Sequence, residues 1–415
     1  MNDLKTLPKL KLAAQQMRAC PIQTRNRLLD HLADDLIKSA PSILRANAKD
    51  LKSLPTKTPS AFRDRLTLNQ LRLQGMEESL RQIARLPDPL MQGGDQRRLS
   101  NGLLLERIRA PLGVILMIYE SRPNVGIECF GLAIKSANVI VLRGGKEARN
   151  TNKALYQLMS HRLQKEGLPT HALWGITNPD RKLVHELLKR REFIDIVVPR
   201  GGDKLIEFVV KNSHIPIIKN DRGLCHAYVD AEADLEMALR IVDNGKTQRP
   251  GVCNSLETVL VHETVKDRFI PKAYEKLSAN EVTWYTCPIT RKILKGRPNV
   301  HLAKPKNWDT EYLDMKINCR VVKSLEEAIS HIETHGSRHS EVIVTHNQAA
   351  AEKFQAEVDA ACVYWNASTR FTDGFEFGLG GELGISTQKL HVRGPVGLEA
   401  LTSLRWVITG TGQIR

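Results

Sequence analysis

The sequence has no long apolar run, and its cysteines are not arranged in pairs. No stretch approaches the roughly 18 consecutive apolar residues that span a bilayer, and residues 1–30 contain no uninterrupted apolar segment typical of a signal peptide. The 7 cysteines form no Cys-x-x-Cys motif, which argues against a disulfide framework or a zinc ribbon and predicts no metal site. We therefore expect a soluble cytoplasmic protein.

Aromatic residues are also scarce, at 5% of the chain, although the formal net charge is +15. Proteins that bind single-stranded nucleic acid stack bases on aromatic side chains, which this composition supplies only thinly. The basic residues are spread along the chain, without the runs of about five or more like charges that mark interaction tails. The charge therefore favours small phosphorylated ligands, and we expect neither a nucleic-acid partner nor a membrane partner.

What the chain does contain is a repeated alternation of apolar runs and helical segments. Near-continuous apolar runs at 111–119, 139–142 and 194–198 are typical of strands buried on both faces of a parallel sheet. Polar loops follow these runs, and segments with helical spacing follow the loops. This repetition predicts a doubly wound α/β fold, in which ligands bind beyond the carboxyl ends of the strands.

The other predicted elements extend the pattern along the chain. We expect two helices within 10–52, with Thr24 as an N-cap and Pro41 as either a break or a first-turn residue. Further helices are expected at 61–86, 151–165, 180–191, 204–211, 235–242, 266–279, 325–335 and 348–358. Further strands are expected at 172–176, 215–218, 224–229, 258–261, 319–322, 341–345 and 361–365, whereas 281–310 shows no clear pattern.

Two loops with paired glycines and a basic residue follow predicted strands, at 143–147 (RGGKE) and 199–203 (PRGGD). Glycines allow a backbone to approach a ligand closely, and Lys146 could hold a phosphate or a ribose hydroxyl. Neither loop matches G-x-G-x-x-G, and paired glycines after a strand often form only a turn. Their recurrence in a repeating unit predicts a nucleotide cleft.

Cys253 lies between a turn signal at 249–251 and an apolar, β-prone run at 258–262. A cysteine at such a junction can be held rigidly and yet remain open to a ligand. Lys246 and Arg249 put positive charge nearby, and cations enrich the nucleophilic thiolate. The alternative is a buried structural cysteine, but the polar neighbours on both sides argue against it.

Two C-terminal segments also stand out. Residues 366–384 form a glycine-rich stretch, in which Ser368, Thr369 and Arg370 could meet an anion; the alternative is a flexible surface loop. Strand-like segments at 103–110 and 404–411 could pair with each other or with a partner subunit, and the alternative is an ordinary edge hairpin.

Six stretches together resemble the aldehyde dehydrogenase superfamily and, within it, the family of γ-glutamyl phosphate reductases. They are 111–125, 141–148, 198–206, 246–258, 365–374 and 378–401. The resemblance implies two doubly wound α/β domains. The cofactor-binding domain would comprise 1–228, with a return of the chain at about 386–400, and the catalytic domain 229–385. Strands at 98–112 and 402–415 would form a small β oligomerisation arm, so we expect a homo-oligomer.

The resemblance also implies a reaction, the NADPH-dependent reduction of L-glutamyl 5-phosphate to L-glutamate 5-semialdehyde and phosphate in proline biosynthesis. Cys253 would attack the acyl phosphate and form a thioester, which hydride then reduces. The oxyanion would be held by the Cys253 backbone N–H and a side chain from the loop after 119, with Asn124 and Ser121 as candidates.

The remaining roles are likewise implied by the resemblance. Cofactor contacts would come from Arg143, Gly144, Gly145, Lys146, Gly201, Gly202 and Glu311. Of these, Lys146 would hold the adenosine ribose or its 2′-phosphate and Glu311 the nicotinamide ribose. Substrate contacts would come from Arg122, Arg249, Ser368, Thr369 and Arg370.

Other features of the resemblance bear on the fate of the thioester and on partners. The glutamate with which general aldehyde dehydrogenases hydrolyse their thioester is replaced by Lys219 or Asn220, so the thioester would await hydride. A separate glutamate 5-kinase would supply the labile substrate, which favours a transient complex. Two competing hypotheses are a hydrolytic aldehyde dehydrogenase and a non-catalytic nucleic-acid or scaffold protein.

Overall fold

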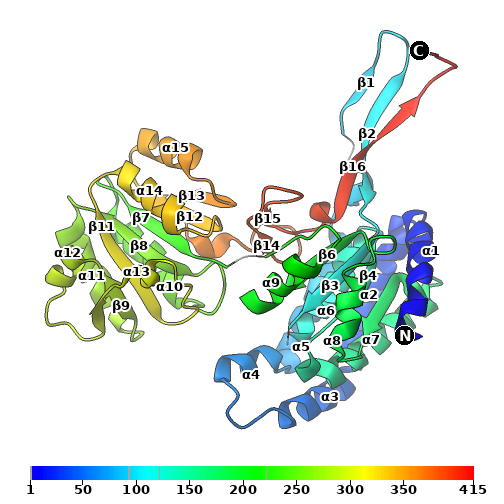
Figure 1. Ribbon diagram of the computed structural model, residues 1–415, viewed down its shortest axis with the longest axis horizontal. Coiled ribbons are helices and arrows are strands. Elements are labelled where there is room, and N and C mark those ends of the chain that lie inside the picture. The colour runs from blue at the N-terminus through cyan, green and yellow to red at the C-terminus, as the bar shows by residue number, and fades with distance from the viewer. Residues whose placement is uncertain (1, 92–93, 121, 221) are drawn as a thin grey trace. The chain divides into compact units, whose positions relative to one another are not determined.

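The computed structural model describes residues 2–91, 94–120, 122–220 and 222–415, which form two compact α/β units (Figure 1). The first unit comprises Met1–Asn220, Gly378–Gly384 and Pro395–Arg415, and the second comprises Asp221–Phe377 and Ile385–Gly394. The first unit thus ends before the predicted boundary at 228, because strand β7 (Cys225–Val229) pairs with β8 (Leu256–His262) in the second unit. The chain was predicted to return to the first unit at about 386–400. It instead returns twice, at Gly378–Gly384 and again from Pro395, and Ile385–Gly394 between them belongs to the second unit.

The first unit is built on a four-stranded parallel sheet in the order β5-β4-β3-β6. The strands are β3 (Val114–Tyr119), β4 (Val139–Arg143), β5 (Leu173–Ile176) and β6 (Ile196–Arg200). Every residue of β3 is buried, which explains why its sequence is continuously apolar rather than alternating. The strand predicted at 215–218 was wrong, since Ile217 makes only an isolated bridge to Val197.

Helices cover the sheet of the first unit (Figure 1). They are α1 (Leu7–Arg18), α2 (Ile22–Lys38), α3 (Ala40–Lys52), α4 (Ser60–Leu66), α5 (Gln70–Arg85), α6 (Pro123–Lys135), α7 (Arg149–Lys165), α8 (Arg181–Leu187) and α9 (Asp203–Asn212). Three helices, rather than the predicted two, occupy 7–52. Pro21 is the N-cap of α2, so the predicted Thr24 cap was wrong, whereas Pro41 lies in the first turn of α3, as one of the two readings predicted.

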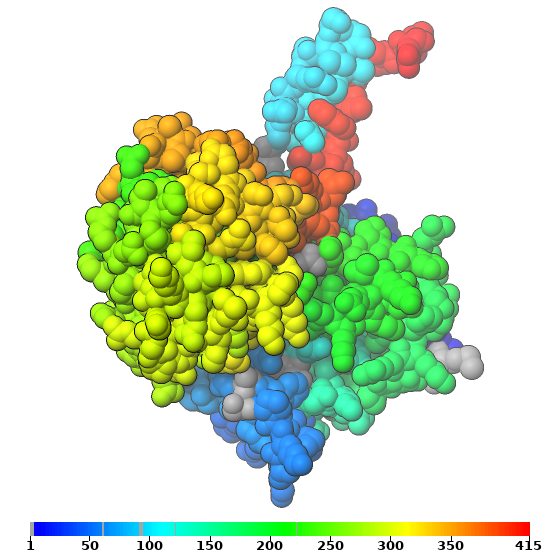
Figure 2. Space-filling model, turned by 60° about the vertical axis from the view of Figure 1, so that its left-hand side comes forward, coloured from blue at the N-terminus to red at the C-terminus, as the bar shows by residue number. Residues whose placement is uncertain are grey.

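An antiparallel arm extends the first unit, with strands in the order β1-β2-β16. Its strands are β1 (Gln96–Arg98), β2 (Leu104–Pro111) and β16 (Thr402–Thr409), and β2 pairs with β16 along its full length. The cyan atoms of β1 and β2 lie beside the red atoms of β16 in Figure 2. The structure therefore confirms that the two predicted end strands pair with each other.

The second unit is built on a seven-stranded parallel sheet in the order β10-β9-β11-β8-β7-β12-β13. Its remaining strands are β9 (Thr283–Thr286), β10 (Val300–Leu302), β11 (Lys316–Val322), β12 (Ser340–Val344) and β13 (Cys362–Trp365). Its helices are α10 (Leu235–Thr247), α11 (Lys266–Ser278), α12 (Pro288–Ile293), α13 (Pro305–Trp308), α14 (Leu325–His335) and α15 (Gln348–Glu357). Two clusters of buried apolar residues, one including Trp284 and the other Phe354, form its core.

Two segments remain, residues 281–310 of the second unit and residues 366–384, which both units share. Residues 281–310 contain β9, α12, β10 and α13, although no pattern was evident there. The glycine-rich stretch 366–384 contains a short 3-10 helix, η5 (Thr369–Phe371), and is otherwise irregular, as predicted. Short strands β14 (Ile385–Ser386) and β15 (Gly394–Pro395) follow it. None of the described helices is long and apolar enough to cross a membrane.

Candidate active site

Cys253 lies in the turn that joins α10 to β8, directly before a strand that is buried from Leu256 to Val261. Its side chain is partly exposed, so the turn presents the thiol rather than enclosing it. The structure confirms the predicted junction between loop and strand. Because the strands beside β8 run parallel to it, the segments that lead into β7 and β11 arrive at the same amino edge of the sheet.

Gly223, in the segment before β7, packs directly against the backbone of Cys253. A Cβ atom at Gly223 would lie 1.5 Å from the Cys253 carbonyl oxygen, so this position requires glycine. The Gly223 N–H donates to Glu311 Oε1 at 2.9 Å. Glu311, predicted to hold the nicotinamide ribose, thus anchors the residue that supports Cys253. The sequence reasoning missed Gly223, whose signal was a glycine placed just before a predicted strand.

A second thiol, which is buried, contacts the carbonyl group of Cys253. Cys225 Sγ donates to the Cys253 carbonyl oxygen at 3.3 Å. Burial raises the pKa of the Cys225 thiol well above its ordinary value, so this cysteine stays protonated and serves as a donor. The two contacts from Gly223 and Cys225 fix the backbone of Cys253 from one side.

Residues 368–372 hold the turn through backbone and side-chain contacts. Thr369 Oγ1 donates to the Asn254 carbonyl oxygen at 2.8 Å, and Asn254 Nδ2 donates to the Thr372 carbonyl oxygen at 2.8 Å. Ser368 Oγ accepts from the Arg370 backbone N–H at 3.3 Å. The structure therefore brings the predicted substrate residues Ser368, Thr369 and Arg370 together with the Cys253 turn.

Two arginines supply positive charge at this turn. Arg370 Nε donates to Gln248 Oε1 at 2.8 Å, and its guanidinium also contacts Asn254 Oδ1. Burial lowers the pKa of Arg370, the Arg249 guanidinium lowers it further, and Asp373 and the Cys253 thiol oppose the shift. Arg249 itself is exposed. The cluster thus offers a partly desolvated cation and an exposed one, which suits an anionic substrate.

Lys246 does not supply the charge predicted for it. Its side chain is 0% exposed, and Nζ donates to the Leu256 carbonyl oxygen at 2.9 Å and lies 3.1 Å from Glu257 Oε2. Burial raises the pKa of Glu257 to about 7, and the Lys246 ammonium opposes this shift. The charge of Lys246 is therefore matched by Glu257, and the cationic role falls to Arg249 and Arg370.

In the first unit, three loops follow neighbouring strands at the carboxyl edge of the sheet. They begin at Glu120 after β3, at Gly144 after β4 and at Gly201 after β6. The Gly202 N–H, at the start of α9, donates to Glu120 Oε2 at 3.1 Å and so connects the first and third loops. The two predicted glycine loops therefore lie where doubly wound sheets bind ligands.

Parts of these loops fit a nicotinamide dinucleotide. A Cβ at Gly202 would meet nothing within 4 Å, so the space beside its α-carbon is open at the amino end of α9, and helix amino ends bind phosphate groups. Its own N–H, however, already donates to Glu120. A Cβ at Gly201 would instead meet Glu120 and Leu205 at 2.6 and 2.8 Å. Lys146 is exposed and makes no hydrogen bond or ion pair with any described residue, so its ammonium is available for a ribose hydroxyl or a phosphate.

Two other predicted cofactor residues serve the loop itself. A Cβ at Gly144 would lie 2.1 Å from Asn152 Nδ2, so packing alone already requires a glycine here, and its predicted contact with the cofactor stays a prediction. The Arg143 guanidinium donates to the carbonyl oxygens of Gly144 at 3.2 Å and Pro179 at 3.1 Å. Gly145 is the N-cap of the short helix Lys146–Ala148.

The oxyanion candidates lie after β3. Asn124 is in the first turn of α6 and donates from Nδ2 to Glu128 Oε1 at 3.0 Å, and Arg122 is the N-cap of that helix. Both are half-buried. Ser121 lies outside the described residues. The roles of these residues remain predictions.

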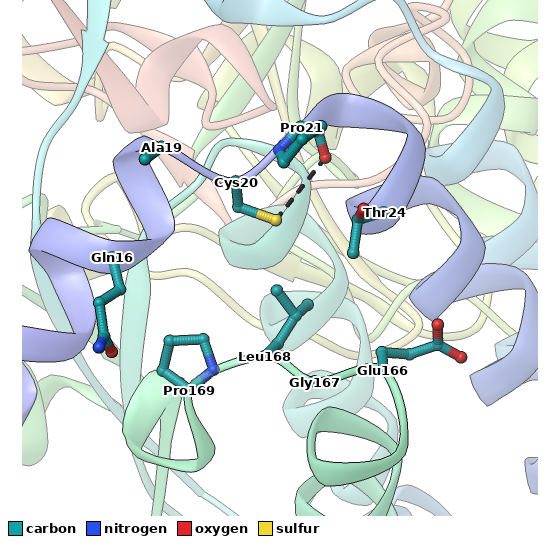
Figure 3. A pocket seen from close by; sticks show the side chains of 9 residues that line it. All are labelled: Gln16, Ala19, Cys20, Pro21, Thr24, Glu166, Gly167, Leu168 and Pro169. Carbon is teal, nitrogen blue, oxygen red and sulfur yellow. Dashed lines mark hydrogen bonds between the residues drawn. The ribbon is translucent and has the colours of Figure 1, made fainter.

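A separate hollow of about 470 Å³ lies in the first unit, where the junction of α1 and α2 meets the segment after α7 (Figure 3). Cys20, Leu168 and Pro169 line it, and none of the predicted site residues does. Burial raises the pKa of Cys20, which makes it a poor nucleophile at neutral pH. This thiol therefore differs in setting from Cys253.

Comparison with known proteins identifies relatives that align with nearly the whole chain. The model described as "Aldehyde dehydrogenase family" matches residues 8–284. A gamma-glutamyl phosphate reductase from Moorella thermoacetica is 48% identical over 404 residues, which cover 97% of this chain and 96% of that protein. One from Clostridium novyi is 46% identical over 413 residues, covering 99% of this chain and 98% of that protein. The crystal structure of gamma-glutamyl phosphate reductase from Thermotoga maritima, at 41% identity, superposes with a TM-score of 0.95 over 99% of both chains.

The chain belongs to the aldehyde dehydrogenase family. Within that family its relatives group it with the γ-glutamyl phosphate reductases, as the sequence resemblance predicted. Membership of the aldehyde dehydrogenase family makes the protein an oxidoreductase and confirms the predicted fold class. The non-catalytic scaffold is therefore excluded as the primary role.

Proposed function

We propose that this enzyme reduces L-glutamyl 5-phosphate to L-glutamate 5-semialdehyde with NADPH, releasing phosphate in the second step of proline biosynthesis. The observation that carries the proposal is the turn of Cys253, which holds a partly exposed thiol beside Arg249 and Arg370. The names of relatives that align along nearly the whole chain support it.

Cys253 is the nucleophile of the first step. Its sulfur bonds to the acyl carbon, the bond from that carbon to the phosphate oxygen breaks, and phosphate leaves with the electron pair. Arg249 and Arg370 bind the phosphate and the α-carboxylate, because guanidinium groups match both anions bidentately. The enzyme is left as a thioester at Cys253.

The second step regenerates the thiolate. NADPH supplies the hydride that this step requires. Negative charge develops on the substrate carbonyl oxygen, which the Cys253 backbone N–H and Asn124 stabilise. The hydride bonds to the acyl carbon and gives a tetrahedral intermediate. The carbon–sulfur bond of this intermediate then breaks, which releases the aldehyde and the Cys253 thiolate. Lys146, Gly201 and Gly202 bind the adenosine and pyrophosphate portion of NADPH, and Glu311 binds the nicotinamide ribose.

The chain also lacks the water-activating acid of hydrolytic relatives at the expected position. One candidate for that position, Asn220, donates from Nδ2 to the Pro199 carbonyl oxygen at 3.2 Å, and an amide cannot act as a general base. The other candidate, Lys219, likewise has no carboxylate that could activate water. The thioester therefore persists until it is reduced.

The reverse reaction tests the proposal. With glutamate semialdehyde and NADP⁺, we expect NADPH to form only when inorganic phosphate is added, because phosphate must release the acyl group from Cys253. NADPH absorbance at varied phosphate measures this. Turnover without phosphate would contradict the proposal and indicate a hydrolytic aldehyde dehydrogenase.

A complex with glutamate 5-kinase, which would shield the labile substrate, is checked by co-sedimentation of the two purified proteins.

We also propose that the arm mediates a homo-oligomer. Leu404, Trp406 and Ile408 point to one face of β16 and are 44%, 46% and 59% exposed. Arg97 and Arg107 lie over the Trp406 ring at 5.5 and 5.6 Å, so the face is apolar with a basic rim. Burying that face against a second copy would remove apolar surface from water.

Trp406→Glu is expected to reduce the mass in solution toward that of a monomer, because the new carboxylate would have to be buried in the interface. Sedimentation velocity measures the mass. Ser403→Glu is the control, since it adds the same charge on the opposite face of β16. Equal masses for both variants and the wild type would contradict a role of this face.

A further inference from the structure

We propose that Glu257, held in place by its buried ion pair with Lys246, is a positioning residue whose hydrogen bond to Leu313 fixes the loop of Glu311 against the Cys253 turn and thereby sets the affinity of the enzyme for NADPH. The inference rests on the proposed function, in which Glu311 binds the nicotinamide ribose. Lys246 and Glu257 are inferred to act through other residues and not to touch substrate or cofactor.

The pair closes the base of the Cys253 turn. Lys246 is in the last turn of α10, and Glu257 is the second residue of β8. Both side chains are 0% exposed, and the Lys246 ammonium bonds both Glu257 Oε2 and the Leu256 carbonyl oxygen. The two ends of the turn that carries the nucleophile are therefore tied together.

Glu257 also reaches a third segment. Its other oxygen, Oε1, accepts from the Leu313 backbone N–H at 3.2 Å. Leu313 stands close to Glu311 in the chain, and Glu311 Oε1 accepts from Gly223, which packs against the Cys253 carbonyl oxygen. The contacts thus form a closed path from the turn through Glu257 to the Glu311 loop and back to the turn.

Stability alone is a weak reason for such a pair. Two charges lose their water on burial, and apolar residues of similar volume often replace a buried ion pair without loss of stability. A hydrogen bond requires a particular direction between donor and acceptor, whereas an apolar contact does not. Glu257 links two segments at defined atoms, which fixes their relative position, whereas an apolar side chain would only fill the space.

Two double variants separate positioning from stability. Lys246→Met/Glu257→Gln and Lys246→Met/Glu257→Leu both remove the two charges, so neither leaves an uncompensated buried charge. The glutamine retains an acceptor for the Leu313 N–H, whereas the leucine does not. Binding of NADPH and of 2′,5′-ADP, which lacks the nicotinamide ribose, is measured by calorimetry with the purified full chain. Thermal unfolding of each variant is recorded beside it.

We expect the leucine variant to bind NADPH about tenfold more weakly than the glutamine variant, as it would if the Glu311 loop were correctly placed only about a tenth of the time. The affinity for 2′,5′-ADP should be equal in both variants, because Glu311 does not contact that ligand. Should the leucine variant fail to fold, Lys246→Met/Glu257→Met gives the same comparison with a more adaptable side chain.

Each contrary result has its own meaning. Equal NADPH affinities in the two variants would overturn the inference, as would parallel losses of NADPH and 2′,5′-ADP binding, which indicate a general structural role. A wild-type enzyme that binds no NADPH would overturn the proposed function together with the inference.

Discussion

Cys253→Ala is expected to lower kcat by at least about a thousandfold, the scale seen when a covalent nucleophile is removed. Alanine has no atom that can bond to the acyl carbon, so the thioester route is lost. The partly exposed position of Cys253 and its turn are otherwise unaffected by so small a change. The phosphate-dependent formation of NADPH from glutamate semialdehyde measures the loss.

Cys20→Ala is the matched control for that experiment. Cys20 is also partly exposed, but it lies in the separate hollow near the α1–α2 junction (Figure 3). Its activity should stay within about twofold of the wild type, since surface substitutions away from a site have small effects. Full activity of Cys253→Ala, or equal losses in the two variants, would contradict the assignment of the nucleophile.

Gly223→Ala is expected to lower kcat/KM by about a hundredfold, although the change adds a single methyl group. That methyl group would lie 1.5 Å from the Cys253 carbonyl oxygen, so the backbone of the nucleophile must move. A displacement of about 1 Å of a reacting group can reduce the rate by this factor. Steady-state kinetics on the folded variant, checked by circular dichroism, measure the effect.

Gly251→Ala separates this mechanism from a general intolerance of the turn. Gly251 is in the same turn as Cys253, and a Cβ there would meet only the Leu313 carbonyl oxygen at an ordinary 3.9 Å. We expect it to retain activity within a few-fold of the wild type. If Gly223→Ala were equally active, the backbone of Cys253 would be less constrained than this contact implies.

The elements that sequence patterns predicted best are those whose burial leaves a simple signal. Both β3 and β4 lie in the middle of a parallel sheet, so their sequences are continuously apolar and were recognised as strands. The short elements within 281–310 were missed, because β9 and β10 span only 4 and 3 residues and leave too few positions to show a period.

The site was predictable in its residues but not in its pairings. The junction at Cys253 follows from local sequence, whereas the partners of Arg370 are 116 and 122 positions away in the chain. Lys246 was assigned to the thiol because sequence shows a charge but not the carboxylate that matches it. Likewise, the sequence shows a glycine at position 144, but it does not show that Asn152 occupies the space that a side chain there would need.

The pairing of β2 with β16 has a consequence for the order of events during synthesis. Arg109 of β2 and Glu399, just before β16, are 290 positions apart, so one side of the arm is made long before the other. At about 5–20 residues per second, β2 leaves the ribosome roughly 15–60 s before its partner strand. During that interval its outer edge has free backbone groups that can pair with other chains. The growing polypeptide therefore depends on β16, made much later, to close an early edge, and chaperone binding at β2 would protect that edge until then.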